Sequence, residues 1–493
     1  MKCLCGRSLK SRIESKAARM VRIPTLAATV LATVLSPLVH ALSASEQSGN
    51  RPNIILVLAD NLGYGDLGCY GQKRIKTPHL DRMAAEGMRF TQFYAGATIC
   101  APSRCVLMTG LHSGHCRIRG NHTNQHAQAL KLDDRTLAEV LKGQGYRTAV
   151  IGKWGLGDEG NAGIPNLQGF HYFFGYLNQV HAHNYYPHFL WKNQRRVPLA
   201  NVVKHPKKLY QSPELAGVAT KRIEYAPDLC TTEALAFIKR QTKDQPFFLY
   251  LPYTYPHPNC ESWLLERHGA EVPEFGIYAR TDWPDVQKGH ATMITRMDRD
   301  IGRILDLLRE LGLDHNTLVL FNSDNGPHEG DGLDPEFNDS NGQLRGALRD
   351  MYEGGMRVPL IARWPGRVPA GQTSGYVGSS VDFMATFAEL AGARPPGTDG
   401  ISMLPTLLGR EQQQKQHEYL YWEFYERGSA QGVRWGDWKA VRKPMITGPI
   451  ELYDLQNDLG ETSDVSAEHP DVVAKIGQIT QAEHVPSPLW TAP

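Results

Sequence analysis

Four short runs of apolar residues constrain the fold of this chain more than any other feature. They are NIILVLAD (53–60), YRTAVIG (146–152), PFFLYLPY (246–253) and TLVLFNSD (317–324). Each is rich in β-branched, aliphatic or aromatic residues at consecutive positions. A strand that is apolar on both sides is typical of a parallel sheet covered on both faces. The runs therefore predict buried parallel strands.

Helical patterns lie between these runs. Residues 291–312 are the clearest case, and the others are 80–88, 136–145 and 381–392. The apolar stripe of the first segment consists of Ile294, Met297, Ile301, Ile304, Leu305 and Leu308. Spacing of three and four residues places such positions on one helix face. Strands that alternate with helices predict an α/β fold with a large, mostly parallel sheet sandwiched by helices.

The sequence pattern of the chain changes after the Pro/Gly-rich segment ARPPGTDG, which we interpret as a domain boundary. Segments 418–425 and 433–442 are short and aromatic and predict antiparallel strands, and residues 469–484 predict one helix. We expect a catalytic domain over 50–395 and a small C-terminal α+β subdomain over 396–493.

The N-terminus has the form of a signal peptide over residues 1–41. Seven basic residues and one acid precede the apolar run IPTLAATVLATVLSPLV, which ends in small residues at Val39-His40-Ala41. The alternative is an uncleaved membrane anchor, but Pro24 and Pro37 leave the run short for a membrane span. We expect an exported protein, periplasmic or secreted, without stable membrane insertion.

Net charge argues against a nucleic-acid partner. The whole chain carries +2, but residues 1–41 hold seven basic residues and one acid, so the remainder carries −4. The basic excess therefore belongs to the leader. Six cysteines follow the leader, and their spacing contains no CxxC metal pattern and leaves any disulfide pairing open.

Polar pairs follow two of the predicted strands. Asp60-Asn61 comes after the first strand and Asp324-Asn325 after the fourth. Ligands of open α/β sheets bind beyond the carboxyl ends of the strands. Carboxylate and amide oxygens there would suit a hard cation such as Ca²⁺ or Mg²⁺. The alternative is that they are turn and helix-capping residues.

Segment 100–110, CAPSRCVLMTG, predicts a helix that begins near Cys100, with Pro102 in its first turn. A thiol at a helix N-terminus is expected to have a lowered pKa. Arg104 lies one turn along and would be able to bind an oxyanion with two donors. The alternative for Cys100 is a buried structural cysteine.

Together these segments resemble the formylglycine-dependent, arylsulfatase-like sulfatases of the alkaline-phosphatase-like superfamily, over residues 51–490. Cys100-Ala101-Pro102-Ser103-Arg104 matches the Cys-x-Pro-x-Arg signature in which the cysteine is oxidised to formylglycine. The other matching segments are LADNLGYGDLG (58–68), GKWGLG (152–157), YPHP (255–258), NSDNG (322–326), YEGGMRVPLIARWPG (352–366), GDWKAVR and ELYDLQND.

The resemblance implies a role for each residue. Cys100, as hydrated formylglycine made by a maturation enzyme, would be the nucleophile toward sulfur. Arg104 would stabilise the hydrated aldehyde, Lys153 would bind sulfate, and His257 would contact the ester or leaving oxygen. The metal, Ca²⁺ with Mg²⁺ as the alternative, would be held by Asp60, Asn61, Asp324, Asn325 and Cys100. Outside these motifs, Lys153 and His257 would be interpreted as a surface lysine and a loop histidine.

Three positions depart from the family pattern. Asn61 stands where a second acid is usual, which weakens the expected metal affinity. Gly155 stands where GKWHLG has histidine, and His183, in a histidine-rich segment, is the candidate to replace it as a substrate-binding residue. Its alternative is simple packing with neighbouring aromatic residues. Leu348 stands where sulfatases commonly carry a lysine that contacts sulfate. Arg349 or Arg345 is the candidate to substitute for it, and Arg349 would need a different backbone path.

We therefore predict an exported sulfatase, a sulfuric ester hydrolase, whose substrate is a sulfated carbohydrate. Two alternatives remain open. One is a catalytically impaired relative that binds a sulfated ligand, suggested by Leu348, Asn61 and Gly155. The other is a phosphate or phosphonate ester hydrolase of the same superfamily.

Overall fold

A computed structural model describes residues 51–121, 129–204 and 215–491, which belong to one compact unit. The signal peptide predicted over residues 1–41 lies outside the described residues. Within the described ranges, no helix is both long enough and apolar enough to cross a membrane.

A ten-stranded mixed sheet forms the centre of the fold, in the order β13-β2-β12-β11-β1-β10-β4-β5-β6-β7. The four predicted strands are its middle: β11 (Thr317–Ser323), β1 (Asn53–Ala59), β10 (Phe247–Pro252) and β4 (Arg147–Lys153). They are adjacent and all parallel. The predicted α/β fold is therefore confirmed.

Strands that the sequence did not predict complete both edges of the sheet. Antiparallel pairings occur where β12 joins β11 and where β6 joins β5. The edge strands are β5 (Tyr172–Tyr176), β6 (Phe189–Lys192) and β7 (Arg195–Pro198) on one side, and β12 (Leu360–Arg363), β2 (Met88–Phe90) and β13 (Gln372–Ser374) on the other.

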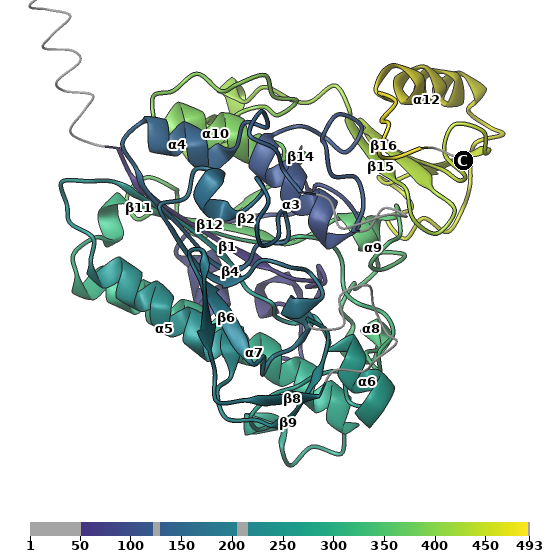
Figure 1. The fold of residues 1–493 in the computed structure, drawn as a ribbon. Coiled ribbons are helices and arrows are strands. Elements are labelled where there is room, and N and C mark those ends of the chain that lie inside the picture. The colour runs from purple at the N-terminus through teal and green to yellow at the C-terminus, as the bar shows by residue number, and fades with distance from the viewer. Residues whose placement is uncertain (1–50, 122–128, 205–214, 492–493) are drawn as a thin grey trace, which may run out of the picture. The chain divides into compact units, whose positions relative to one another are not determined.

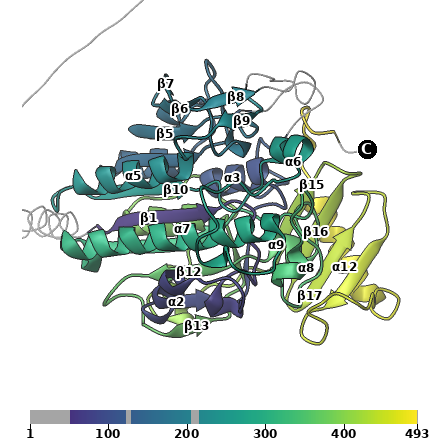
Figure 2. The same cartoon turned by 90° about the horizontal axis from the view of Figure 1, so that it is seen from below.

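Both faces of the central strands are buried, as their composition predicts. Along β1, Ile54 and its alternate neighbours pack into one apolar cluster with α3, α4 and α10. Ile55 and its alternate neighbours pack into the other with α2, α5 and α7. Figure 1 shows α4 and α10 on one side of the sheet, and Figure 2 shows α5 and α7 on the other. The helices are α2 (Pro78–Ala85), α3 (Cys100–Thr109), α4 (Leu137–Gly143), α5 (Ala226–Lys239), α7 (Asp285–Glu310) and α10 (Asp382–Leu390).

Shorter elements connect this framework. Two small sheets pair β3 (Phe93–Tyr94) with β14 (Gly378–Ser379), and β8 (Val202–Lys204) with β9 (Val218–Lys221). The short α-helices are α6 (Cys260–Glu266), α8 (Pro335–Asn338), α9 (Glu353–Met356) and α11 (Leu404–Leu407). The 3₁₀ turns are η1 (Gly68–Tyr70), η2 (Pro165–Leu167), η3 (His181–His183), η4 (Gly276–Tyr278), η5 (Asp314–Asn316) and η6 (Glu411–Gln413).

The C-terminal region forms the predicted antiparallel sheet and single helix. Its strands are β15 (Leu420–Phe424), β16 (Ala430–Trp435), β17 (Trp438–Arg442) and β18 (Ile450–Asp454), followed by α12 (Pro470–Ala482). The prediction of one strand over 433–442 is wrong. Gly436 has a φ of 58°, so the chain turns there and forms a hairpin between β16 and β17. The boundary at residue 395 stays a prediction.

Buried polar contacts attach this C-terminal sheet to the segment after β3 and to helix α9. Trp422 Nε1 donates to the Ala95 carbonyl oxygen at 3.0 Å, and Lys439 Nζ donates to Glu353 Oε1 at 2.9 Å. Asn121 links the loop after β15 to the start of α3, because its N–H donates to Glu426 Oε1 at 2.8 Å and its Oδ1 accepts from the Ala101 N–H at 3.0 Å. The C-terminal region thus contributes to the surroundings of Cys100.

Candidate active site

The predicted polar residues converge because their strands are neighbours. The order β11-β1-β10-β4 puts four carboxyl ends on one edge of the sheet. Asp324 follows β11, Asp60 follows β1, and Lys153 ends β4. His257 lies in the loop after β10. The N-terminus of α3 brings Cys100 to the same place.

Two carboxylates and two cations are paired at this edge. Lys153 Nζ lies 2.6 Å from Asp60 Oδ2, and both Arg104 Nε (3.0 Å) and Nη2 (2.8 Å) donate to Asp324 Oδ2. Burial opposes ionisation of Asp60, but Lys153 and other cationic neighbours outweigh it and hold the pKa of Asp60 below its usual value. Burial and the Asp60 carboxylate raise the pKa of Asp324 to about 6.

Arg104 is fully buried and is already occupied by protein groups. Besides Asp324, it donates from Nη1 to the Lys153 carbonyl oxygen at 2.6 Å. A role for Arg104 toward a hydrated aldehyde stays a prediction. Lys153 is only 1% exposed, so the alternative of a surface lysine is wrong.

The predicted metal ligands fit a hard divalent cation. All their donors are oxygens apart from Cys100, and Asn61 Oδ1 lies 2.6 Å from Asn325 Nδ2. Asn325 Oδ1 is buried and has no hydrogen-bond partner among the described residues. A buried acceptor without a donor is costly unless a cation or donor binds it. Asn61 has a φ of 65°, a conformation that asparagine tolerates better than most residues.

Cys100 is the first residue of α3 and is 2% exposed. Its thiol donates to Asp60 Oδ1 at 3.2 Å and lies 3.6 Å from Asn61 Oδ1. Burial, followed by the Asp60 carboxylate, raises the pKa of Cys100 well above the usual value. The expectation of a lowered pKa from the helix N-terminus is therefore wrong, because desolvation and a neighbouring negative charge outweigh the helix dipole. The unmodified thiol would be a poor nucleophile.

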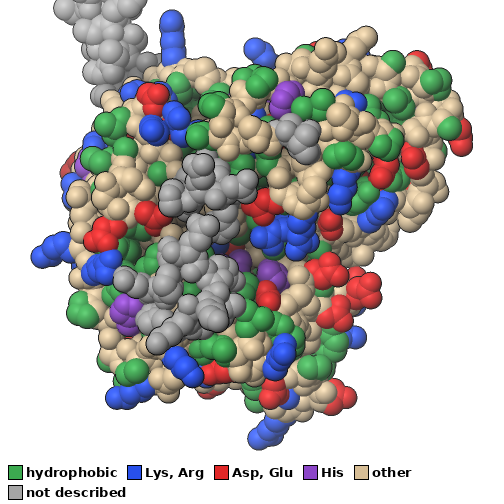
Figure 3. All heavy atoms as spheres, turned by 45° about the vertical axis from the view of Figure 1, so that its right-hand side comes forward, with side chains coloured by type: hydrophobic (Ala, Val, Ile, Leu, Met, Phe, Trp, Pro, Cys, Tyr) green, Lys and Arg blue, Asp and Glu red, His purple; other side chains and the backbone are tan. Residues whose placement is uncertain are grey.

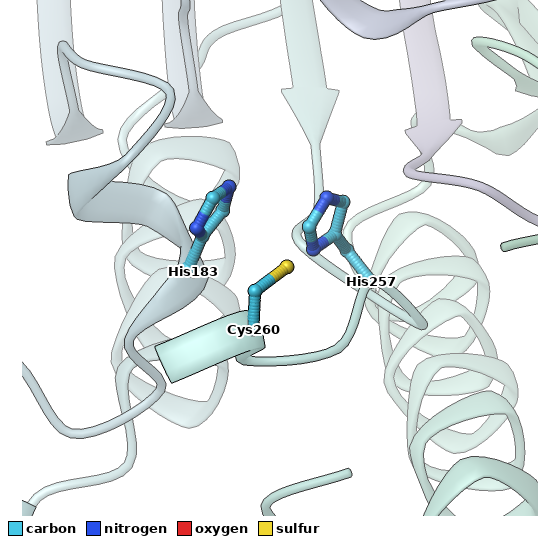
Figure 4. Close-up of side chains that lie close together, drawn as sticks. All are labelled: His183, His257 and Cys260. Carbon is cyan, nitrogen blue, oxygen red and sulfur yellow. The ribbon is translucent and has the colours of Figure 1, made fainter. Parts of the chain in front are cut away.

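A cavity of about 420 Å³ opens beside Cys100, and histidines line it. The rings of His183 and His257 stack with centroids 4.8 Å apart and planes at 14°. Figure 4 shows these two rings and the Cys260 sulfur pointing toward one another. His181, in contrast, packs against Tyr176 and Phe189. In Figure 3, histidine side chains lie beside Lys and Arg side chains near the middle of the face shown.

The two stacked histidines have defined partners. His257 Nδ1 donates to the Pro258 carbonyl oxygen at 2.7 Å, and His183 Nδ1 lies 3.2 Å from Glu261 Oε1. Burial lowers the pKa of His257 well below its usual value, although Asp60 opposes this shift. A neutral ring whose Nδ1 donates to a carbonyl has its lone pair on Nε2. His257 also has a ring nitrogen within 4.8 Å of Asp60 and Cys100 ligand atoms.

Leu348 lines the cavity, and of the two arginines considered as substitutes only Arg349 lines it too. Arg349 has a φ of 76°, in the left-handed region of the backbone. Arg345 instead lies over the ring of Tyr352, 3.8 Å from its centroid, and donates to the Tyr453 hydroxyl. Arg345 is therefore not a substitute for the missing lysine.

Gly155 leaves space that another side chain fills. A Cβ at Gly155 would lie 2.1 Å from Gln179 Nε2, and Gly155 has a φ of +78°. Gln179 Nε2 donates to the Gly155 carbonyl oxygen at 3.3 Å, and Gln179 lines the cavity together with His183. The space beside Gly155 is therefore occupied by Gln179.

Several cavity residues were missed by sequence reasoning. Besides Gln179, they include Asn121, Cys260, His328, Asp331 and Arg427. His328 and Cys260 had a local signal, because a single residue separates each of them from a motif, Pro327 in the case of NSDNG and Asn259 in the case of YPHP. The others lie farther from the motifs in sequence.

Comparison with known proteins gives the family. The protein-family model described as "Sulfatase" matches residues 52–393, and a second family model, described as "N-sulphoglucosamine sulphohydrolase, C-terminal", matches residues 347–482. Arylsulfatase A of Homo sapiens is 32% identical, over 90% of this chain and 89% of its own length. N-acetylgalactosamine-6-sulfatase of Sus scrofa is 36% identical, over 72% of this chain but only 66% of its own length.

Solved structures agree in fold. Ps i-CgsB in complex with k-i-k-neocarrahexaose matches with a TM-score of 0.72 and 26% identity, over 90% of this chain and 95% of that one. BT33336S-sulf, from the metabolism of multiple glycosaminoglycans in Bacteroides thetaiotaomicron, matches with a TM-score of 0.71 and 27% identity. The match covers 88% of this chain and 99% of that one. The fold is that of the alkaline-phosphatase-like superfamily. The chain belongs to the sulfatase family, a family of sulfuric ester hydrolases.

Proposed function

We propose that this protein is an exported sulfatase that hydrolyses a sulfate ester of a carbohydrate to the alcohol and inorganic sulfate. Water supplies the oxygen that sulfate gains, and the broken bond is the S–O bond to the alcohol. The observation that carries the proposal is the convergence of Asp60, Asp324, Lys153 and Arg104 on Cys100 at one sheet edge.

Formylglycine made from Cys100, together with Ca²⁺ or Mg²⁺, would supply the nucleophilic oxygen and the Lewis acid. Asp60, Asn61, Asp324, Asn325 and residue 100 would hold the cation. The raised pKa of the Cys100 thiol supports this assignment, because the unmodified residue offers little thiolate.

The protein's own residues provide charge and orientation. Lys153, whose pKa Asp60 raises despite burial, stays cationic and would neutralise negative charge on the sulfate. Arg104 fixes Asp324 and the end of β4. A bound sulfate anion beside His257 would favour the protonated ring, which would then be able to give a proton to the leaving oxygen.

His183 and Arg349 are proposed substrate contacts, because both line the cavity next to Cys100. Arg349 would supply the positive charge that Leu348 lacks. The carbohydrate class is supported by the named relatives, which include an N-acetylgalactosamine-6-sulfatase and a protein solved with neocarrahexaose. Export is proposed from the charge pattern of residues 1–41.

Sulfate release tests the proposal directly. The protein would be co-expressed with a formylglycine-generating enzyme, and oxidation of Cys100 would be verified by mass spectrometry. A panel of sulfated sugars would then be assayed with calcium present and Cys100→Ala as the control. We expect release that vanishes in the variant. No release from oxidised protein on any sugar would contradict the proposal.

One competing function is favoured by a specific observation. Leu348 is apolar, 8% exposed and packed in one cluster with Ile99 and Cys100, where a leucine provides no oxyanion contact. A protein that only binds sulfated ligands would release no sulfate as the wild type and would gain release on Leu348→Lys. Release by the wild type would exclude this alternative. A phosphate or phosphonate ester in the same panel would test the remaining alternative, a phosphate or phosphonate ester hydrolase.

A further inference from the structure

A line of three polar side chains leads away from the proposed cation site. Asn61 Nδ2 lies 3.3 Å from His328 Nδ1, and His328 Nε2 lies 3.0 Å from Asp331 Oδ2. Asn61 is 1% exposed and His328 is 8% exposed. The line connects the loop after β1 with the loop after β11.

The direction of these hydrogen bonds follows from the neighbouring amide of Asn325. Asn325 Nδ2 donates to the Gly326 carbonyl oxygen at 2.9 Å and to Asn61 Oδ1 at 2.6 Å, so the Asn61 atom that faces His328 is its amide nitrogen. An amide nitrogen only donates, so His328 Nδ1 is the acceptor, and the ring proton lies on Nε2, toward Asp331 Oδ2.

The acceptor at His328 Nδ1 holds the Asn61 amide in this orientation. With its nitrogen held by His328, its oxygen faces the other way, 3.6 Å from Cys100 Sγ and 2.6 Å from Asn325 Nδ2. An amide is nearly symmetric in shape, so a rotation of 180° would present an NH₂ group where a cation requires an oxygen. A carboxylate has two equivalent oxygens and needs no such partner. Asparagine at position 61 is therefore held in this orientation by the acceptor at His328 Nδ1, together with the donor at Asn325 Nδ2.

We propose that His328 is a positioning residue that holds the Asn61 amide oxygen toward the divalent cation, and that Asp331 sets the tautomer of His328. The inference rests on the proposed cation site and deepens it. It explains how a site with an amide in place of a carboxylate presents an oxygen ligand. Outer hydrogen-bond partners of metal ligands commonly act in this way.

The test measures calcium affinity rather than activity. The full chain would be stripped of metal with a chelator and titrated with Ca²⁺ in a calorimeter. His328→Phe keeps a flat ring but removes the acceptor, and we expect it to raise the Kd about 10- to 100-fold. His328→Asn offers an acceptor oxygen near the Nδ1 position and should rescue binding to within about threefold.

A second background separates positioning from a general structural role. In Asn61→Asp, either carboxylate oxygen is able to face the cation. There, His328→Phe should change the Kd by less than about threefold. The melting temperature in chelator should be alike for all variants. If His328→Phe does not fold, Asp331→Ala, which frees the tautomer, should weaken binding in the wild-type background but not in the Asn61→Asp background.

The outcomes are distinguishable. Wild-type protein that binds no calcium would overturn both the cation site and this inference. Wild-type protein that binds calcium while His328→Phe binds equally well would overturn the inference alone. An equal loss on His328→Phe in the wild-type and Asn61→Asp backgrounds would also overturn it, because the effect would then not depend on the amide.

Discussion

Arg104 and Asp324 form an ion pair in which both side chains are fully inaccessible to solvent, with Arg104 Nη2 2.8 Å from Asp324 Oδ2. The pair joins helix α3, which begins at Cys100, to the residue that follows strand β11. A charge buried in this way is tolerated only because its partner is present. The pair therefore links the position of Cys100 to the carboxyl edge of the sheet.

Arg104→Met should lower the free energy of unfolding by about 3–5 kcal/mol, because it leaves Asp324 buried without its main partner. Urea unfolding of metal-free protein would measure the change. The control is Arg309→Met, which breaks the Arg309–Asp306 pair, where both side chains are more than a third exposed. That change should cost less than about 1 kcal/mol. If the two substitutions lowered the free energy of unfolding equally, the buried Arg104–Asp324 pair would be no more important for stability than an exposed pair.

Arg349 should matter for turnover, whereas Arg345 should not. Arg349→Ala removes the cation that lines the cavity beside Leu348, and we expect a loss of about 10²-fold in kcat/KM for a sulfated sugar. Arg345→Ala is the matched control, because Arg345 lies over Tyr352 outside that cavity. Both would be assayed by sulfate release. Similar losses for the two variants would show that Arg349 has no special role.

Gly155 should resist substitution for two separable reasons. Its φ of +78° is unfavourable for other residues, and a Cβ there would lie 2.1 Å from Gln179 Nε2. Gly160 has a φ of +81° with open space around a Cβ. Gly160→Ala should therefore cost about 1 kcal/mol from the backbone alone. Gly155→Ala should cost measurably more in urea unfolding unless Gln179→Ala accompanies it. If Gly155→Ala and Gly160→Ala lowered the free energy of unfolding equally while Gln179 is retained, the predicted clash with Gln179 would be refuted.

Asp66 should make the free energy of unfolding depend on pH. Burial raises its pKa from 3.8 to about 7, although hydrogen bonds, including one from the Gly63 N–H at 2.8 Å, act in the opposite sense. The folded state thus holds this proton more tightly than the unfolded state. Its contribution is fully present below about pH 4 and is lost as pH rises toward 7, with a slope of up to about 1.4 kcal/mol per pH unit.

Asp66→Asn should remove this contribution to the slope between pH 4 and 7. Urea unfolding at a series of pH values would compare it with the wild type. Asp133→Asn, at a side chain that is 79% exposed, is the control and should keep the wild-type slope. An unchanged slope in Asp66→Asn would mean that folding does not raise the pKa of Asp66.

The central strands and much of the candidate site were predictable from local sequence. Residues 53–60 and 317–324 are mostly apolar until a carboxylate ends the run, and that pattern indicates both a buried strand and the position of its polar end. The two pairs at 60–61 and 324–325 lie together because parallel neighbouring strands end at one edge.

Other features required long-range contacts that leave no local pattern. The lowered pKa expected for Cys100 was wrong because the sequence shows the helix but not the burial or the nearby Asp60. The hairpin at Gly436 leaves no break in the local pattern, because aromatic residues continue on both sides of the turn. Gln179 gave no signal, since its importance depends on the space beside Gly155.

The sequence alone therefore determined the central parallel strands, the order of the motifs and the chemistry of the residues at the strand ends, because apolar periodicity and residue type are local properties. The tertiary structure decided which charges neutralise one another, which arginine enters the cavity and which way the Asn61 amide faces. These features depend on contacts between residues that are far apart in the sequence. Asn61 Nδ2 and His328 Nδ1, for example, lie 3.3 Å apart, although 267 positions separate the two residues in the chain.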